Sequence, residues 1–172
     1  GIIANPNCTT IVMLMALAPV HRAFGAKRVV ASSYQAVSGA GAAAMEELAK
    51  QVRAWAAGEK IEAHAFPHQI AFNVIPHIDS FLDDGFTKEE MKLLHETRKI
   101  IGDDSIRVCP TTVRVPVFTA HSVSVAVETA KPATVAQARE VLSKAPGLQV
   151  IDDPGAMKYP MPLDAAGQDD CF

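Results

Sequence analysis

Residues 5–25 read NPNCTTIVMLMALAPVHRAFG and carry the strongest structural signal in the chain. Asparagine commonly caps helices and glycine commonly ends them, so Asn5 or Asn7 can begin a helix that Gly25 ends. Between these ends, the sequence is apolar on nearly every helical face. A helix of this kind packs between other elements and does not lie on a surface. The stretch therefore predicts a buried helix inside a folded domain.

Extended and helical patterns alternate along the rest of the chain. Valine-rich runs at residues 27–37 and 105–118, and valine alternating with small residues at 121–130, predict strands. Shorter strands are expected at 70–78 and 148–152. Helical spacing predicts helices at residues 42–58, 87–102 and 134–147. We expect an α+β, or mixed α/β, fold with a mixed, largely antiparallel sheet and helices mainly on one face.

Composition excludes several classes of function. The 172 residues are 49% hydrophobic and 20% charged, which suits one domain with a substantial core. A net charge of −3 predicts no nucleic-acid partner, and no apolar run reaches the roughly 18 residues that cross a bilayer, so no membrane contact is expected. Three widely spaced cysteines argue against disulfides and a zinc site. We therefore expect no metal and a reducing, cytoplasmic location.

Cys8 falls at the first turn of the helix expected from residues 5–25. It is either a small hydrophobic residue that starts a buried helix, or a nucleophile whose thiolate the helix N-terminus stabilises. A nucleophilic cysteine needs a partner that moves protons. Among the six histidines, His121 stands out because it lies between two expected strands, seven residues after Arg114. The residues alone leave both interpretations of Cys8 open.

Four segments in order resemble the aspartate-β-semialdehyde dehydrogenase family. They are NPNCTT (5–10), SSYQAVSGAG (32–41), AFNVIPHID (71–79) and VRVPVFTAHSVSV (113–125). The resemblance is to the C-terminal catalytic and dimerisation domain, which has a glyceraldehyde-3-phosphate-dehydrogenase-like fold. It implies reversible oxidation of L-aspartate-4-semialdehyde with NADP and phosphate to 4-aspartyl phosphate, a step in lysine, threonine and methionine biosynthesis. It also implies a homodimer formed through this domain.

The resemblance assigns the catalytic and substrate-binding roles. Cys8 matches the nucleophile that forms a thiohemiacetal and then a thioester, and His121 matches the acid/base residue. Gln35 matches a residue that orients the substrate. Arg114 matches the residue that binds the substrate α-carboxylate, and Glu89 the contact to its α-amino group.

The remaining assignments concern phosphate and the cofactor. Lys92, one turn after Glu89, matches a phosphate ligand, and Ser38 and Gly39 match the turn that approaches NADP. The pair Glu96/Lys99 has the same spacing as Glu89/Lys92, but it does not keep the family's distance to Arg114.

Most of the NADP site is expected outside these residues. No G-x-G-x-x-G motif follows a strand, and the chain begins at Gly1 inside an apolar run, GIIAN, typical of a strand. We interpret residues 1–172 as one catalytic and dimerisation domain of a longer protein whose Rossmann domain is absent here. The isolated chain is expected to be inactive in hydride transfer.

Three alternatives remain beside this interpretation. A glyceraldehyde-3-phosphate dehydrogenase also has a cysteine beside two threonines, but it lacks the YQAVSGAG segment and the Arg114–His121 spacing. An N-acetyl-γ-glutamyl-phosphate reductase shares the chemistry, but its cysteine follows Pro-Gly and not Pro-Asn. The third alternative is a non-catalytic dimerisation module with an inert cysteine.

Overall fold

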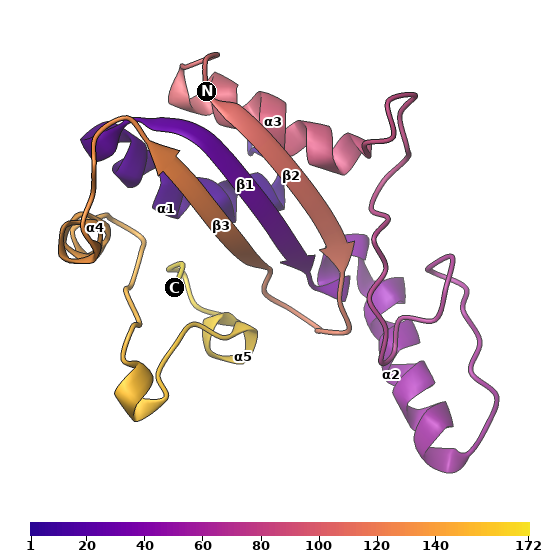
Figure 1. Cartoon of the computed structure of the whole chain (residues 1–172). Helices are drawn as coiled ribbons and strands as arrows, with labels where there is room; N and C mark the ends of the chain where they lie inside the picture. The colour runs from indigo at the N-terminus through magenta and orange to yellow at the C-terminus, as the bar shows by residue number, and fades with distance from the viewer.

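The computed structural model describes all 172 residues, as a three-stranded sheet with helices packed behind it and beyond its ends (Figure 1). In order, the elements are α1 (Cys8–Phe24), β1 (Ala26–Gln35), the short 3₁₀ turn η1 (Val37–Ala40), α2 (Ala42–Ala57), α3 (Lys88–Ile101), β2 (Arg107–Arg114), β3 (Ser122–Thr129), α4 (Val135–Ser143), η2 (Pro154–Ala156) and α5 (Pro162–Ala165). None of these helices has the length and apolar character needed to cross a membrane.

The sheet is mixed, and β1 is its central strand. The strand order is β2-β1-β3; β1 runs parallel to β2 and antiparallel to β3. The expected α+β fold with a mixed sheet is confirmed, but the sheet is not largely antiparallel, because β1 makes one parallel and one antiparallel pair of similar length. Although β2 and β3 follow each other in sequence, they lie on opposite sides of β1. Arg114 ends β2 and His121 precedes β3, so these two residues flank the end of β1.

One face of the sheet is covered and the other is open. Alternate residues of β1 are buried on the face behind the sheet in Figure 1, where α1 packs against β1 and β3 and α3 packs against β2. The resulting core contains Met13 and Leu17 of α1, Val29 of β1 and Leu93 of α3. Helix α1 is less buried than its composition predicts: one stripe is buried, but Ile11 is 36% exposed. The expected placement of helices mainly on one face is confirmed.

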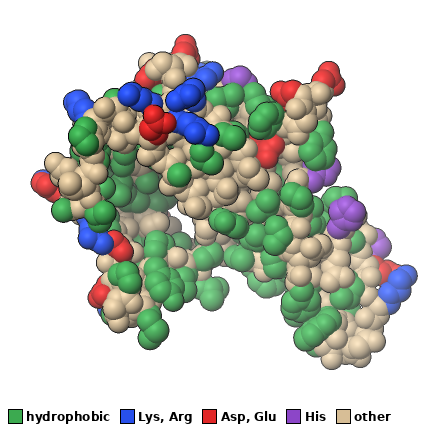
Figure 2. All heavy atoms as spheres, viewed as in Figure 1, with side chains coloured by type: hydrophobic (Ala, Val, Ile, Leu, Met, Phe, Trp, Pro, Cys, Tyr) green, Lys and Arg blue, Asp and Glu red, His purple; other side chains and the backbone are tan.

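The open face of the sheet is poor in charge at its centre. The outward residues there are Val30, Tyr34, Cys109, Thr111, Ser124 and Ala126. Strand register places Val30 between Cys109 and Ala126. Figure 2 shows mainly hydrophobic and uncharged polar atoms over this region, with Lys, Arg, Asp and Glu side chains gathered toward its upper end.

The segment between α2 and α3 is held by side chains and not by strand pairing. Gln51 Oε1 accepts hydrogen bonds from the backbone N–H groups of Ile70 (3.0 Å) and Ala71 (2.9 Å). The strand expected at 70–78 is therefore wrong: it is reduced to a single bridge between Ile75 and Arg114. In that bridge, Ile75 and Arg114 exchange both of their backbone hydrogen bonds (3.0 and 2.8 Å). Residues 148–152 likewise form only one bridge, from Leu148 to Cys171.

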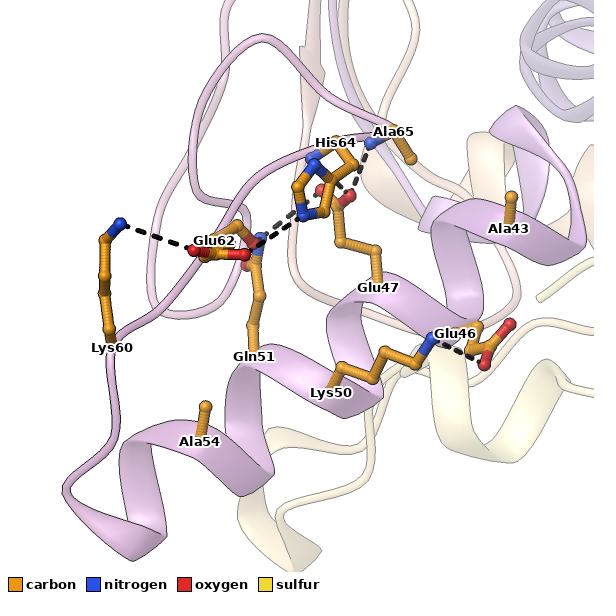
Figure 3. Close-up of a pocket in the computed structure, with 10 residues that line it drawn as sticks. All are labelled: Ala43, Glu46, Glu47, Lys50, Gln51, Ala54, Lys60, Glu62, His64 and Ala65. Carbon is orange, nitrogen blue, oxygen red and sulfur yellow. Dashed lines mark hydrogen bonds and ion pairs between the residues drawn. The ribbon is translucent and has the colours of Figure 1, made fainter.

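A buried acid in α2 anchors the same segment. Glu47 is 6% exposed, and its carboxylate accepts hydrogen bonds from the backbone N–H groups of His64 (2.7 Å), Ala65 and Phe66 (3.4 Å), and from Gln51 Nε2 (3.3 Å). Glu47, Gln51, His64 and Ala65, drawn in Figure 3, are among the residues that line a cavity of about 480 Å³ between α2 and residues 60–65. The Glu47 carboxylate therefore fixes the loop through the backbone N–H groups that it accepts.

Candidate active site

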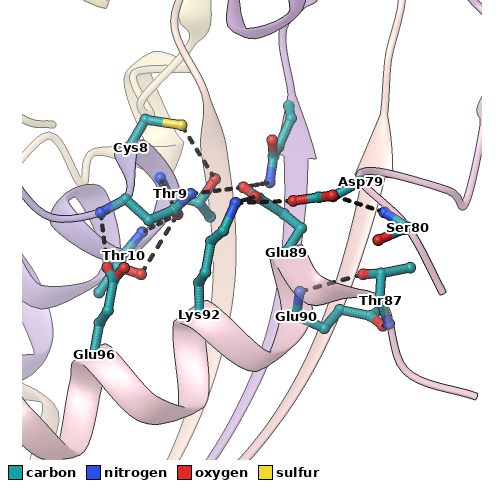
Figure 4. Close-up of polar contacts among 12 residues, drawn as sticks. Cys8, Thr9, Thr10, Asp79, Ser80, Thr87, Glu89, Glu90, Lys92 and Glu96 are labelled. Atoms are coloured by element: carbon teal, nitrogen blue, oxygen red, sulfur yellow. Dashed lines mark hydrogen bonds and ion pairs between the residues drawn. The ribbon is translucent and has the colours of Figure 1, made fainter. Parts of the chain in front are cut away.

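Asn7 begins α1 and thereby places Cys8 at the helix N-terminus. Its Oδ1 accepts hydrogen bonds from the N–H groups of Thr9 (3.0 Å) and Thr10 (3.1 Å), so Asn7, and not Asn5, is the cap. Cys8 is the first helical residue and its side chain is exposed, with Sγ 4.0 Å from Thr9 Oγ1 (Figure 4). The predicted position of Cys8 at a helix start is confirmed.

The carboxylate of Glu89 joins α1, β1 and α3. Glu89 is only 5% exposed; its Oε1 accepts hydrogen bonds from Asn7 Nδ2 (2.9 Å) and Gln35 Nε2 (3.1 Å). Its Oε2 lies 3.3 Å from Lys92 Nζ. A second acid of α3, Glu96, accepts the backbone N–H of Asn7 at 2.7 Å. Glu89, Gln35 and Lys92 are thus brought together beside the residue that caps the helix of Cys8.

Lys92 is shared between two carboxylates. Besides Glu89, it pairs with Asp79 at 3.0 Å (Figure 4). The hydrogen bond to Asp79 is the main reason that the pKa of Lys92 is raised; partial burial opposes this effect and Glu89 adds to it. The Lys92 side chain is 43% exposed, so this ammonium group remains accessible to an anion from solvent.

Arg114 and His121 meet at the end of β1. Arg114 Nη1 donates a hydrogen bond to the carbonyl oxygen of Ala36 (2.8 Å), and the N–H of Ala36 donates one to His121 Nδ1 (3.0 Å). Burial lowers the pKa of His121, and the charge of Arg114 lowers it further, while Glu89 opposes both effects. His121 is therefore favoured as a neutral imidazole near pH 7.

Ser38 and Gly39 lie in η1, next to the same pair. A Cβ atom at position 39 would lie 2.9 Å from Arg114 Nη1 and 3.1 Å from His121 Cε1, so only glycine leaves both side chains undisturbed. Gly39 is exposed and Ser38 half-buried. Bare backbone beside the imidazole fits the close approach of a flat cofactor ring, which is what the resemblance implies for these two residues.

Electrostatic interactions connect the residues around Glu89 with those around Arg114. Glu89 and Cys8 both oppose the lowering of the Arg114 pKa that burial causes, so Arg114 lies within electrostatic range of both. Cys8 and His121 do not hydrogen-bond to each other. The combination of a thiol at a helix start, a buried guanidinium, a neutral imidazole and an accessible ammonium group suits an anionic carbonyl substrate.

Ala36, Asp79 and Glu96 are contacts that the sequence did not indicate, whereas Asn7, predicted as a possible helix cap, also contacts Glu89. Asp79 lies at the end of the AFNVIPHID segment, and Glu96 belongs to the Glu96/Lys99 pair that was set aside. Ala36 acts through its backbone, which leaves no signature in the sequence.

Replacing Asn7 with alanine tests whether this side chain organises the start of α1. Asn7→Ala removes the cap and one partner of the buried Glu89, so we expect the free energy of unfolding to fall by about 1–2 kcal/mol. The matched control is Asn5→Ala, at an exposed asparagine without a side-chain hydrogen bond, with an expected change within about 0.5 kcal/mol. Urea unfolding measures both. Equal effects of the two changes would contradict the assignment.

Sequence matches cover nearly the whole chain. The family model described as "Semialdehyde dehydrogenase, dimerisation domain" matches residues 17–172. The aspartate-semialdehyde dehydrogenase of Aquifex aeolicus is 57% identical over 173 residues, and that of Legionella pneumophila is 50% identical over 173 residues. Each alignment covers 100% of this chain, but 51% and 50% of the respective relative. The chain thus spans about half the length of these curated relatives.

Solved structures share the fold. Aspartate semialdehyde dehydrogenase II of Vibrio cholerae, in complex with ASA, has a TM-score of 0.94 and 46% identity, over 98% of this chain and 49% of that one. A probable aspartate-semialdehyde dehydrogenase of Pseudomonas aeruginosa has a TM-score of 0.91 at 25% identity, over 98% of this chain and 50% of that one. These matches confirm the resemblance noted in the sequence: the chain belongs to the semialdehyde dehydrogenase family, as its dimerisation domain.

Proposed function

We propose that this chain is the catalytic and dimerisation domain of an aspartate-semialdehyde dehydrogenase. The reaction is the NADP-dependent conversion of L-aspartate-4-semialdehyde and phosphate to 4-aspartyl phosphate, run in reverse for lysine, threonine and methionine biosynthesis. The observation that carries the proposal is that Asn7, which precedes Cys8, and Gln35, which ends β1 opposite Arg114, both donate hydrogen bonds to the buried Glu89 carboxylate. A cytoplasmic location, in which thiols stay reduced, suits a catalytic cysteine.

Cys8 is the nucleophile in this proposal. Its sulfur bonds to the aldehyde carbon to give a thiohemiacetal, and loss of hydride from that carbon leaves an acyl-thioester. NADP, when bound, supplies the hydride acceptor. A phosphate oxygen then bonds to the acyl carbon, the C–S bond breaks and the thiolate is released. The start of α1 supports negative charge on the sulfur before and after these steps.

Arg114 and Glu89 recognise the amino-acid end of the substrate. Arg114 Nη1 donates a hydrogen bond to the Ala36 carbonyl oxygen, which leaves the other N–H groups of the guanidinium for the α-carboxylate. The Glu89 carboxylate faces the α-ammonium group, and Gln35, bonded to Glu89, orients the substrate. In a largely buried site, such charge-assisted contacts are stronger than they are in water.

Lys92 and His121 serve the reacting groups. Lys92 is the phosphate ligand; its ammonium group is charged, accessible and held by two acids that a phosphate would partly displace. His121 carries the acid/base role at the substrate oxygen. Its position beside Gly39 also brings it to the edge at which Ser38 and Gly39 would meet the cofactor.

Replacing Cys8 tests the chemistry in the full-length enzyme that contains this domain. With Cys8→Ala, we expect phosphate-dependent NADP reduction by aspartate semialdehyde to fall by more than about a thousandfold in kcat, because no thioester can form. The control is Cys171→Ala, at a half-buried cysteine whose pKa burial raises, with activity retained. More than trace activity in Cys8→Ala would exclude the thioester route through Cys8.

The open face of the sheet is the proposed homodimer interface. It combines an uncharged centre, at Val30 and Ala126, with Arg107 and Glu128 toward one end. An exposed sheet face of this composition is typical of a surface that a second copy covers. Pairing two such faces also removes a large apolar area from water.

Placing a charge on that face tests the interface. Ala126→Glu puts a carboxylate at the centre of the strand row that includes Val30, so we expect the dimer to dissociate to monomers at micromolar concentration. The matched control is Ala136→Glu, on an exposed position of α4, which should stay dimeric. Sedimentation equilibrium measures both variants. A dimeric Ala126→Glu with wild-type affinity would rule out this face.

A further inference from the structure

Ala36 binds two site residues through its own peptide groups. Its carbonyl accepts a hydrogen bond from Arg114, and its N–H donates one to His121 Nδ1. Ala36 is completely buried, at the point where β1 passes into η1. Because β2 and β3 lie on either side of β1, Ala36 at the end of β1 holds both Arg114, from the β2 side, and His121, from the β3 side.

The Ala36 N–H determines which nitrogen of His121 carries hydrogen. A backbone N–H can only donate, so Nδ1 must present its lone pair, and the hydrogen of the neutral ring is on Nε2. A proton on Nδ1 would break this bond. The charged groups acting on the ring are Arg114 of β2 and Glu89 of α3, and burial together with Arg114 outweighs Glu89 in favouring the neutral form.

Gly39 leaves room for the His121 ring because it has no side chain. A Cβ there would lie 3.1 Å from His121 Cε1 and 3.2 Å from Nε2, as well as 2.9 Å from Arg114 Nη1. The φ angle of Gly39 lies outside the left-handed region, so its backbone does not itself demand glycine. Glycine is needed because Arg114 and His121 leave no room for a Cβ atom at this position.

We propose that Ala36 and Gly39 are positioning residues that hold His121 as its Nε2–H tautomer, so that His121 acts first as a hydrogen-bond donor to the substrate oxygen. This rests on the proposed function and restricts the acid/base role given above. As Cys8 sulfur bonds to the aldehyde carbon, the C=O π pair moves to oxygen, which accepts the Nε2–H bond. The hydrogen stays on Nε2, and the same pair re-forms C=O when hydride leaves the carbon; NADP would supply the acceptor for that hydride.

Nitrogen NMR of the resting full-length enzyme, labelled with ¹⁵N-histidine, reads the tautomer directly. At neutral pH, without substrate, His121 should show an unprotonated Nδ1 and a protonated Nε2; His121→Gln assigns the signals. The reverse pattern, or a ring protonated on both nitrogens, would overturn the proposal. If the expected pattern is seen but phosphate-dependent NADP reduction is absent, the tautomer stands and the proposed function fails.

Two separate glycine-to-alanine variants of the same enzyme, at Gly39 and at the control position Gly155, test the role of Gly39. Gly39→Ala should shift the His121 nitrogen signals and lower kcat by about 10- to 100-fold, because the ring is displaced. In Gly155→Ala, the new Cβ makes only ordinary contact (3.6 Å), so both readouts should match wild type. Unchanged His121 signals in folded Gly39→Ala would contradict the positioning role. If that variant does not fold, the wild-type spectrum still decides the tautomer.

Discussion

The buried carboxylate of Glu89 is the contact on which the arrangement of the site depends. A carboxylate that is 5% exposed is stable only when it is paired, and Glu89 is paired with α1 through Asn7, with β1 through Gln35 and with Lys92 in its own helix. Through Asn7 it reaches the cap that places Cys8 at the start of α1. In the proposed function, the carboxylate that orders the start of α1 would also face the substrate ammonium group.

The order of strands explains how the other half of the site forms. If β2 and β3 had paired with each other as a hairpin, Arg114 and His121 would face each other with no strand between them. With β1 between them, both side chains converge on the peptide groups of Ala36, and η1 approaches closely because Gly39 has no side chain. Rigid strands and a buried peptide therefore hold the guanidinium and the imidazole, an arrangement that limits reorganisation during a reaction.

Local rules predicted some elements well and others poorly. Helical spacing predicted the helix at Lys88–Ile101, which Thr87 and Glu90 cap and Gly102 ends, because spacing and capping both depend on near neighbours in the sequence. The strand expected at 70–78 failed at its start because Gln51, distant in sequence, accepts the N–H groups of Ile70 and Ala71. The site roles came from resemblance to a family and stay proposals, although the predicted Glu89–Lys92 pair is present. The sequence could not indicate Ala36, since a backbone contact depends on strand order alone.

The most direct test of the account asks where the acyl group is carried. The full-length enzyme is mixed with aspartate semialdehyde and NADP in the absence of phosphate, quenched in acid, and its peptides are weighed by mass spectrometry. The account predicts a single acyl group on the peptide that contains Cys8, removed when phosphate is added before quenching. An unmodified Cys8 peptide together with NADP reduction, or an acyl group on another residue, would contradict it.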